Sequence, residues 1–256
     1  MQHFDNLFYF SNPHKILKIA LNYFQNSVKI IETNDINLNQ MYLVKGPWYY
    51  EKKYNIIFEE GNFLHLDNGY FKKNLYKRLT INSLQQNKII DVPDDRLQKV
   101  FNNDILPWKE SGDYILILAP NPGPLSYYTN FSTALEWCLD IKQKLSNYTD
   151  RKIFFRFKEN TKNRKLDPLE KYLDNCYAVI TLQSIACIEA ISKGIPTINL
   201  APSCLDALYK CDLSNIETIP QPENRYEWLK SLSYSQFTWE EMQNGKAINI
   251  LERFHT

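Results

Sequence analysis

Residues 177–200 limit the possible folds of this chain more than any other part of its sequence. Residues 177–182 form a continuous apolar run rich in β-branched side chains, which is typical of a parallel strand covered on both faces. Ser184 follows and can cap a short helix, and Gly194 stands where a left-handed helix end belongs, before a second buried strand. The stretch therefore predicts a strand–helix–strand unit whose helix starts at the carboxyl end of a strand. Open α/β sheets bind ligands at that edge, and helix N-termini favour phosphate.

The residues before this stretch also alternate between predicted strands and helices. Buried strands are predicted over residues 114–119 and 152–157, with an amphipathic helix over residues 131–145 between them. The proline-rich run at residues 120–124 is expected to be a stiff loop that continues neither strand nor helix. This alternation indicates an α/β fold with a doubly wound parallel sheet. Shorter helices are expected over residues 168–173, 203–211 and 224–232, and a capping box at Thr238 and Glu241 opens a last helix that reaches residue 254.

The first half of the chain has weaker patterns. A helix is predicted over residues 12–25, with Ser11 or Asn12 as its cap and Pro13 at its first position. Four short strands are predicted over residues 28–31, 41–44, 55–58 and 63–66. We therefore expect a reduced α/β lobe over residues 1–110, a second lobe over residues 111–235 and a C-terminal helix over residues 236–256.

Composition restricts the class of protein. The net charge of +1 argues against a protein that coats nucleic acid but leaves a local basic groove open. No apolar run is long enough to cross a bilayer and the first residues lack a secretion signal, so we expect a cytoplasmic protein without a membrane partner. Five cysteines without CxxC spacing indicate free thiols in a reducing compartment. The histidines lack metal-ligand spacing and no Asp-x-Asp pair ends a strand, so we expect no metal and no other cofactor.

The residues from Ser184 to Pro196 also carry a family resemblance. Their pattern, Ser-x-x-x-x-Glu-Ala-x-x-x-Gly-Ile-Pro, resembles the donor-side signature of GT-B-fold glycosyltransferases, which sugar-nucleotide epimerases of the same fold share. The resemblance implies two Rossmann-like lobes, with a C-terminal helix packing back on the first lobe. It also implies that Ser184 contacts the diphosphate of a nucleotide-sugar and that Glu189 meets a ribose or sugar hydroxyl. The alternative is an ordinary strand–helix–strand unit with a capped helix.

Further donor contacts are expected where the strands of the second half end, because the carboxyl ends of parallel strands lie along one edge of a sheet. Lys158 supplies a point charge for a diphosphate, and Arg156 can add a bidentate clamp. The Phe-Arg-Phe-Lys run that contains both resembles strand-end cations of the same glycosyltransferases. The alternative for Lys158 is a solvated side chain. The remaining candidates at these strand ends are Asn121, Gly123 and Gln183.

The first half contributes two candidate catalytic residues, His65 and Asp67. They alternate along a predicted strand and therefore face the same side of it. Sugar transfer with inversion needs a carboxylate or a histidine to take the proton of the acceptor hydroxyl. Asp67 is our first choice for this base and His65 the second. Alternatively, Asp67-Asn68-Gly69 is only a β-turn, because Asn-Gly is a strong turn signal.

Basic residues next to this loop are candidate acceptor contacts. The small size and short first lobe resemble glycosyltransferases encoded by bacteriophages, which decorate hydroxymethylated bases in DNA. That resemblance implies double-stranded DNA as the acceptor and the host cytoplasm as the location, with cations that contact phosphates for positioning. Alternatively, these basic residues only form a solvated face of the protein. The candidate acceptor contacts are Lys45, Trp48, Lys72, Lys73, Lys77 and Arg78.

Together these patterns predict a metal-independent glycosyltransferase of the GT-B type. It would move a sugar from a nucleotide-sugar to a hydroxyl, with a hydroxymethylated pyrimidine such as 5-hydroxymethylcytosine in phage DNA as the expected acceptor. The alternatives are a glycan-directed transferase, a sugar-nucleotide epimerase or polyol-phosphate transferase of the same fold, and a non-catalytic protein that binds nucleotide or DNA.

Overall fold

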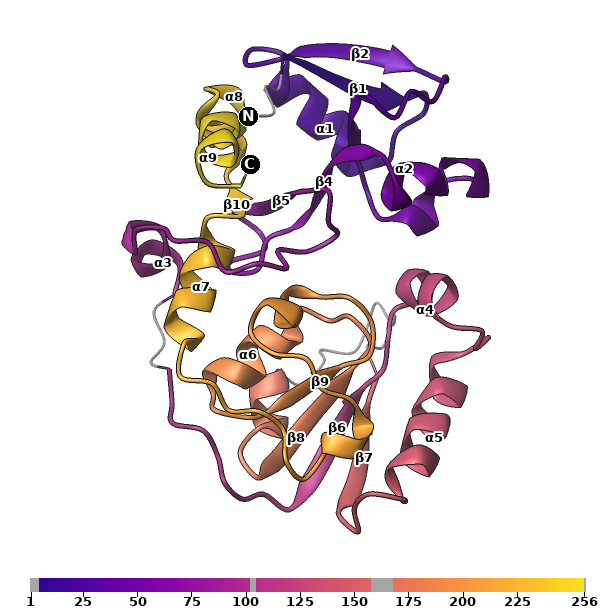
Figure 1. Ribbon diagram of the computed structural model, residues 1–256, viewed down its shortest axis with the longest axis vertical. Coiled ribbons are helices and arrows are strands. Elements are labelled where there is room, and N and C mark those ends of the chain that lie inside the picture. The colour runs from indigo at the N-terminus through magenta and orange to yellow at the C-terminus, as the bar shows by residue number, and fades with distance from the viewer. Residues whose placement is uncertain (1–4, 102–104, 158–167, 256) are drawn as a thin grey trace. The chain divides into compact units, whose positions relative to one another are not determined.

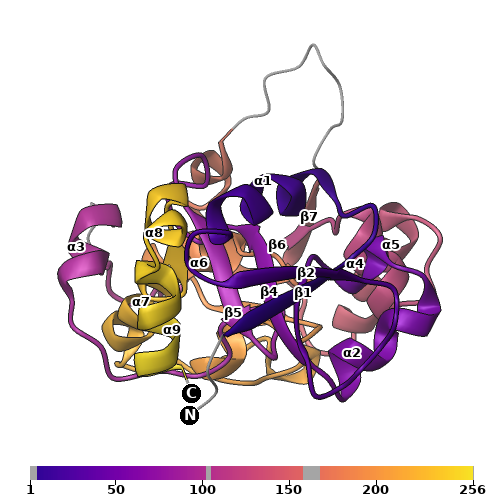
Figure 2. The same ribbon diagram turned by 90° about the horizontal axis from the view of Figure 1, so that it is seen from above.

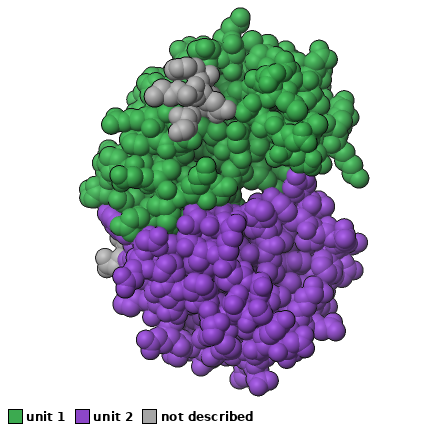
Figure 3. Space-filling view, in the orientation of Figure 1, with its two compact units in different colours: residues 1–102, 227–256 green, residues 103–226 purple. Residues whose placement is uncertain are grey.

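The computed structural model describes residues 5–101, 105–157 and 168–255 of this mixed α/β protein. The chain divides into two compact units (Figure 3). Each unit has its own sheet. Unit 1 comprises residues 1–102 and 227–256, and unit 2 comprises residues 103–226. Within the described residues, no helix combines the length and apolar character needed to cross a bilayer.

The sheet of unit 1 has six strands in the order β10-β5-β4-β3-β1-β2. The four strands β2, β1, β3 and β4 run parallel, whereas β5 pairs antiparallel with β4 and with β10. The chain leaves β1 for β2 on one side and reaches β3 on the other, so the strand order reverses between β1 and β3. The strands are β1 (Asn6–Phe10), β2 (Lys29–Thr33), β3 (Met41–Val44), β4 (Asn62–Asn68), β5 (Lys77–Ile81) and β10 (Gln236–Phe237).

Helices from both ends of the chain share the core of unit 1. Helix α1 (Lys15–Phe24) contributes Leu17, Ala20 and Phe24 to the same buried cluster as Met242 and Leu251 from the C-terminal segment. The C-terminal helices α8 (Trp239–Gln243) and α9 (Lys246–Phe254) therefore complete this core (Figures 1 and 2). The other helices are α2 (Asn55–Glu59), α3 (Asp95–Val100) and the 3-10 turns Pro47–Tyr49 and Lys52–Tyr54, and α7 (Arg225–Ser233) crosses from unit 2 into unit 1.

The sheet of unit 2 has four parallel strands in the order β7-β6-β8-β9. Its central strand β6 is buried on both faces: Ile115 and Ile117 pack in one cluster with α5, and Leu116 and Leu118 pack in another with α6 (Figure 1). Here the strand order reverses between β6 and β8. The elements are β6 (Tyr114–Leu118), α4 (Pro122–Tyr128), α5 (Ala134–Leu145), β7 (Lys152–Arg156), β8 (Cys176–Thr181), α6 (Ala186–Ser192), β9 (Thr197–Asn199) and the 3-10 turns Leu169–Tyr172, Cys204–Ala207 and Leu213–Asn215.

Two local predictions are confirmed by the backbone. The strand–helix–strand unit over residues 177–200 is β8, α6 and β9, and Gly194 has a φ of 76° at the end of α6. A side chain at Gly194 would also place a Cβ 1.9 Å from the carbonyl oxygen of Pro107, so only glycine fits there. The capping box of Thr238 and Glu241 opens α8, with both reciprocal hydrogen bonds present.

Other expectations were wrong. The first lobe is not reduced, because the unpredicted strands β1, β5 and β10 enlarge its sheet to six strands. Residues 55–58 belong to helix α2 rather than to a strand, and α1 is capped by His14 rather than by Ser11 or Asn12. The last helix is interrupted at Gly245, whose φ is 79°.

Only the first two residues of the run at residues 120–124 form a loop, because the other three begin a helix. Helix α4 starts at Pro122, whose missing N–H is one that the first turn of a helix leaves unpaired in any case. The helix expected over residues 203–211 is only a 3-10 turn at Cys204–Ala207.

Candidate functional site

At the carboxyl edge of the unit 2 sheet, the ends of all four strands are in register. Leu118 of β6 is in register with Arg156 of β7 and with Thr181 of β8, and Thr181 is in register with Asn199 of β9. The loops after β6 and β8 flank the reversal of strand order, where open α/β sheets bind ligands. The predicted residues Asn121, Gly123, Gln183 and Ser184 all lie in or directly after these loops.

Ser184 forms the turn that leads from β8 into α6. Its backbone N–H donates to Thr181 Oγ1 at 2.7 Å, and its Oγ accepts from the backbone N–H of Ala186 at 3.2 Å. The hydroxyl of Ser184 thus keeps its own proton to donate to a ligand.

Gln183 ties this turn to two neighbouring segments. Its Nε2 donates to Tyr128 Oη at 2.9 Å and to the carbonyl of Pro202 at 2.7 Å. Burial raises the pKa of Tyr128 to about 12, so its phenol stays neutral and accepts this bond. Gln183 therefore organises the edge of the sheet, and the protons of its amide are already used.

The other predicted donor contacts that the structure describes in unit 2 lie on different elements. Asn121 is exposed and makes no side-chain cap bond to α4. Arg156 ends β7 with its guanidinium 5.5 Å from the centroid of the Tyr172 ring. Glu189 is exposed on α6, and Lys158 lies outside the described residues.

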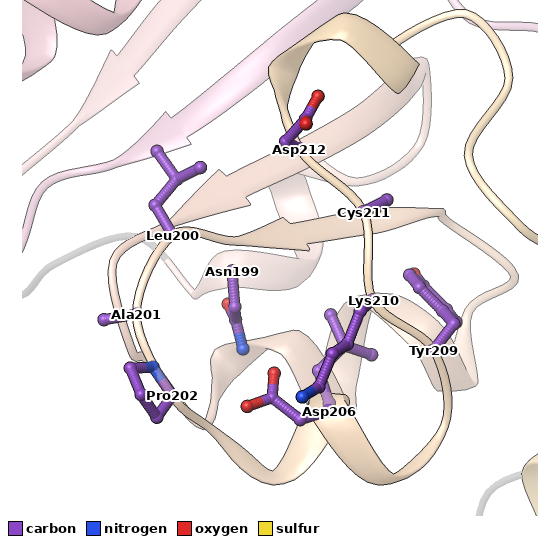
Figure 4. Close-up of a pocket in the computed structure, with 10 residues that line it drawn as sticks. Asn199, Leu200, Ala201, Pro202, Asp206, Tyr209, Lys210, Cys211 and Asp212 are labelled. Atoms are coloured by element: carbon purple, nitrogen blue, oxygen red, sulfur yellow. The ribbon is translucent and has the colours of Figure 1, made fainter.

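A pocket of about 310 Å³ follows β9 and was not expected from the sequence (Figure 4). Asn199, the last residue of β9, donates from Nδ2 to Ser203 Oγ at 2.6 Å. Its Oδ1 is buried and has no hydrogen-bond partner among the described residues. The charged side chains of Asp206, Lys210 and Asp212 line the same hollow, and Asp206 also closes a capping box with Ser203. A single asparagine at a strand end carries no pattern that would have identified it.

The carboxyl edge of the unit 1 sheet carries a compact charged cluster. Asp67 on β4 is in register with Arg78 on β5, and Lys45 follows the end of β3. Lys45 Nζ donates to Asp67 Oδ1, and Arg78 Nη2 donates to Asp67 Oδ2 at 3.4 Å. Lys45 and Arg78 are 6% and 5% exposed, whereas the Asp67 side chain is 21% exposed. The fold thus brings together three residues that the sequence analysis selected from separate segments.

Electrostatics fix the charge states of this cluster. Burial alone would raise the pKa of Asp67, but the charges of Arg78 and Lys45 outweigh it and hold that pKa well below its usual range. Burial lowers the pKa of Lys45, although Asp67 opposes the shift. Burial also lowers the pKa of His65 to about 3, with the charge of Arg78 acting in the same direction. Asp67 is therefore ionised and His65 neutral at physiological pH.

His65 and Asp67 differ in their access to a substrate. His65 is 1% exposed, so its ring is closed to solvent. Asp67 Oδ1 accepts from Lys45 and from the backbone N–H of Asn68 at 2.7 Å. Asp67 Oδ2 has only the long bond from Arg78 within the described residues, so it is the oxygen with room for another donor.

His14 is a further residue at this edge that the sequence analysis missed. It follows β1 and caps α1, where its Nδ1 accepts from the backbone N–H of Ile16 at 3.3 Å. Its ring centroid lies 4.6 Å from that of Tyr49, and Lys45 Nζ lies 5.7 Å from the same Tyr49 centroid. Burial lowers the pKa of His14, and Lys45 adds to the shift. Its position in the sequence, between an apolar strand and the start of a helix, could have identified His14 as a candidate.

The basic run does not form one face. Arg78 is buried against Asp67 and lies 5.1 Å from the centroid of the Tyr70 ring. Lys72 and Lys73 are exposed, and Lys77 Nζ donates to Asn68 Oδ1 at 3.3 Å. Trp48 is partly buried in the turn after Lys45, with its ring centroid 6.0 Å from that of Tyr49.

The described part of the chain contains no group of three or more His, Cys, Asp or Glu side chains suited to hold a metal ion. Its five cysteines carry free thiols, and the sulfur atoms of Cys187 and Cys204 lie 3.8 Å apart.

No protein-family model matches this chain, and no curated protein matches it either. The solved structures that resemble it include Thermosulfurimonas dismutans KpsC, described as a β-Kdo 2,7 transferase, and the β-Kdo 2,4 transferase of the same protein. The first has a TM-score of 0.49 and 12% identity, with 95% of this chain and 99% of that chain covered. The second has a TM-score of 0.46 and 11% identity, with 90% and 91% covered. Since both TM-scores are below 0.5, neither similarity decides the fold or the activity of this chain.

Proposed function

We propose that this chain is a GT-B-type glycosyltransferase that moves a sugar from a nucleotide-sugar to a hydroxyl acceptor. The observation that carries the proposal is the repeated strand order: each unit has four parallel strands whose order reverses after the first strand, with polar side chains at the reversal. The Ser184 to Pro196 pattern adds support, because it coincides with β8, α6 and β9. We base the assignment on the sites, since a fold alone does not imply a function.

In this proposal the donor binds to unit 2. The hydroxyl of Ser184 and the amide of Asn121 donate to the diphosphate, and Arg156 and Lys158 neutralise part of its charge. The pocket after β9 accepts the nucleotide base or the ribose, because the Oδ1 atom of Asn199 offers an unused acceptor. Gly123 and Gln183 shape the loops around the diphosphate, and Glu189 contacts a hydroxyl.

The acceptor binds to unit 1, with Asp67 as the base. Its Oδ2 takes the proton of the acceptor hydroxyl while that oxygen attacks the anomeric carbon, and the bond to the nucleotide diphosphate breaks with its electron pair on the diphosphate. His14 is less available as the base, because its Nδ1 already accepts a hydrogen bond and the proton of the neutral ring is then on Nε2. His65 remains the second candidate, but its buried ring would first have to become exposed.

Two classes of acceptor remain within the proposal. A hydroxymethylated pyrimidine in duplex DNA is supported by the exposed side chains of Lys72 and Lys73 beside Lys77. A glycan is supported by the compact cluster of Lys45, Asp67 and Arg78, which suits a small polar molecule.

A donor screen with mass spectrometry tests the proposal. Nucleotide-sugars are incubated with hydroxymethylated DNA, unmodified DNA and simple glycans, and the expected result is an acceptor heavier by one sugar residue. Asp67→Asn is expected to slow formation of that product by about a hundredfold or more, whereas Asp91→Asn, at an exposed aspartate of the same unit, is the matched control. Conversion of a nucleotide-sugar without any acceptor would indicate an epimerase instead, and nucleotide binding without product would indicate a non-catalytic protein.

A further inference from the structure

The cluster at the carboxyl edge of unit 1 contains more buried positive charge than negative charge. Lys45 and Arg78 share the single carboxylate of Asp67. The charged groups that act most strongly on Lys45 are Asp67, Arg78 and Lys77, of which only Asp67 is negative. Because a buried charge is costly without a counter-charge, this imbalance favours an additional anion at the cluster.

The guanidinium of Arg78 has unused hydrogen-bond donors. It has five N–H groups, yet among the described residues it makes one hydrogen bond, the 3.4 Å bond from Nη2 to Asp67. Its Nε is buried and has no hydrogen-bond partner in the described part of the chain. The ring of Tyr70 lies against the guanidinium, and the Tyr70 hydroxyl accepts from the backbone N–H of Gln86 at 2.6 Å, which holds the ring in place. A nearly buried, fixed planar fork of donors is the arrangement that binds carboxylate or phosphate oxygens in pairs.

The cluster is open on one side. The Asp67 side chain is partly exposed and Asn68 is exposed. Tyr49, which is 50% exposed, lies between Lys45 and His14 at the start of α1. Arg78, Asp67, Lys45, Tyr49 and His14 thus form a row of side chains along the edge of the sheet from β5 to β1. The ten-residue helix α1 adds the positive end of its dipole to this row.

We propose that this row recognises the anionic group of an acidic acceptor, a sugar that carries a carboxylate or a phosphate ester beside the hydroxyl to be glycosylated. Arg78 binds two oxygens of the anion, Lys45 adds a point charge, and Asp67 remains next to the hydroxyl. The two cations are then balanced by two anions. The role as an acceptor site rests on the proposed function, whereas the binding of the anion does not require transfer to occur.

Calorimetry on the whole chain without any donor tests the proposal. Glucuronate is expected to bind at least tenfold more tightly than glucose. Arg78→Gln is expected to remove that preference, and Arg78→Lys, which keeps the charge but not the fork, to reduce it by about threefold. Lys29→Gln, at an exposed lysine of β2, is the matched control and should change neither affinity. A melting curve for each variant verifies folding, and Arg78→Lys keeps the test valid if Arg78→Gln unfolds.

Glucose 6-phosphate separates the two sources of the anion. Tighter binding of this sugar than of glucuronate assigns the site to phosphate esters, and the reverse assigns it to carboxylates; both support an acidic acceptor. Affinities of the wild-type chain for glucuronate and glucose 6-phosphate that both equal its affinity for glucose, or a preference for the acidic sugar that is undiminished in Arg78→Gln, would overturn it. Arg78-dependent glucuronate binding without transfer to any acceptor would refute the proposed function alone. Transfer to neutral acceptors at a rate unchanged by Arg78→Gln would refute the acidic acceptor alone.

Discussion

The two sheet edges share a strand order and differ in their chemistry. At the edge of unit 1, buried charges face one another, with Lys45 and Arg78 on either side of Asp67. In the loop after β8 of unit 2, the side chains that make hydrogen bonds are neutral: Gln183 donates to Tyr128 and to the carbonyl of Pro202, and Ser184 accepts from Ala186. The shared topology thus supplies the place for a site, and the residues after each strand decide what that site can bind.

This contrast predicts the largest effect at Asp67. Asp67→Asn keeps the shape of the side chain but removes the charge that takes the proton, so kcat for sugar transfer should fall by about a hundredfold or more. Donor affinity, measured by calorimetry, should stay near normal because the donor binds to unit 2. Full activity of Asp67→Asn would assign the base to another group and leave Asp67 as the partner of two cations.

The units should also differ in acid stability, because the three histidines within the described residues belong to unit 1. Burial lowers the pKa of His65 to about 3 and that of His255 to about 4, whereas an unfolded histidine titrates near 6.5. Between these values the unfolded chain binds protons that the folded unit does not. The free energy of unfolding should therefore decrease as the pH falls below about 6.5, by about 1.4 kcal/mol per pH unit for each such histidine.

Hydrogen exchange at pH 7 and pH 5, corrected for intrinsic rates, measures this difference. Peptides of unit 1 should lose protection before those of unit 2. His65→Leu should flatten the pH dependence of unit 1, whereas His14→Gln, at an exposed histidine, should change it less. Equal loss of protection in both units would contradict the difference in titration.

The third prediction concerns the hydroxyl of Ser184 in unit 2. Ser184→Ala removes one donor to the diphosphate and one acceptor for the Ala186 N–H, so donor affinity should fall by roughly fivefold to tenfold, about 1–1.4 kcal/mol. Lys158→Ala should lower donor affinity further, because it removes a full charge. Ser126→Ala, at an exposed serine of the same unit, is the control. Unchanged affinity in both Ser184→Ala and Lys158→Ala would mean that the diphosphate does not bind at this edge.

The sequence predicted the fold best where the pattern is local. The apolar run of β8 and the left-handed Gly194 determine their own conformations, and the capping box at Thr238 depends on residues only three positions apart. Strand β10 depends instead on pairing with β5, about 160 residues earlier. A two-residue strand has no periodicity to detect, so it could not be predicted from local pattern.

The candidate sites show the same difference between local patterns, which could be predicted, and long-range contacts, which could not. Alternation along a strand was enough to select Asp67 and His65, but not to reveal that Arg78 turns inward from an otherwise basic run. That orientation follows from the antiparallel register of β4 and β5, which sets Arg78 opposite Asp67. His14 and Asn199 are single polar residues beside strands, and only the assembled edge distinguishes them from solvated side chains.

The smallest expected effect is at Glu189, which tests how far the donor site of unit 2 extends along α6. Glu189 is exposed, and it acts electrostatically on Lys193 one turn later. Glu189→Gln keeps the length of the side chain and removes its charge, so a hydroxyl contact would be weakened rather than lost. The KM for the donor should rise by roughly twofold to fivefold, and the KM for the acceptor should not change. Glu170→Gln, which removes the carboxylate bonded to Lys193 outside the proposed contacts, is the matched control. If both variants raise the KM for the donor equally, the rise is caused by the changed electrostatic environment of Lys193 and not by loss of a contact to the donor. A rise in Glu189→Gln alone would extend the donor site of unit 2 onto α6 and give that edge a charged contact of its own.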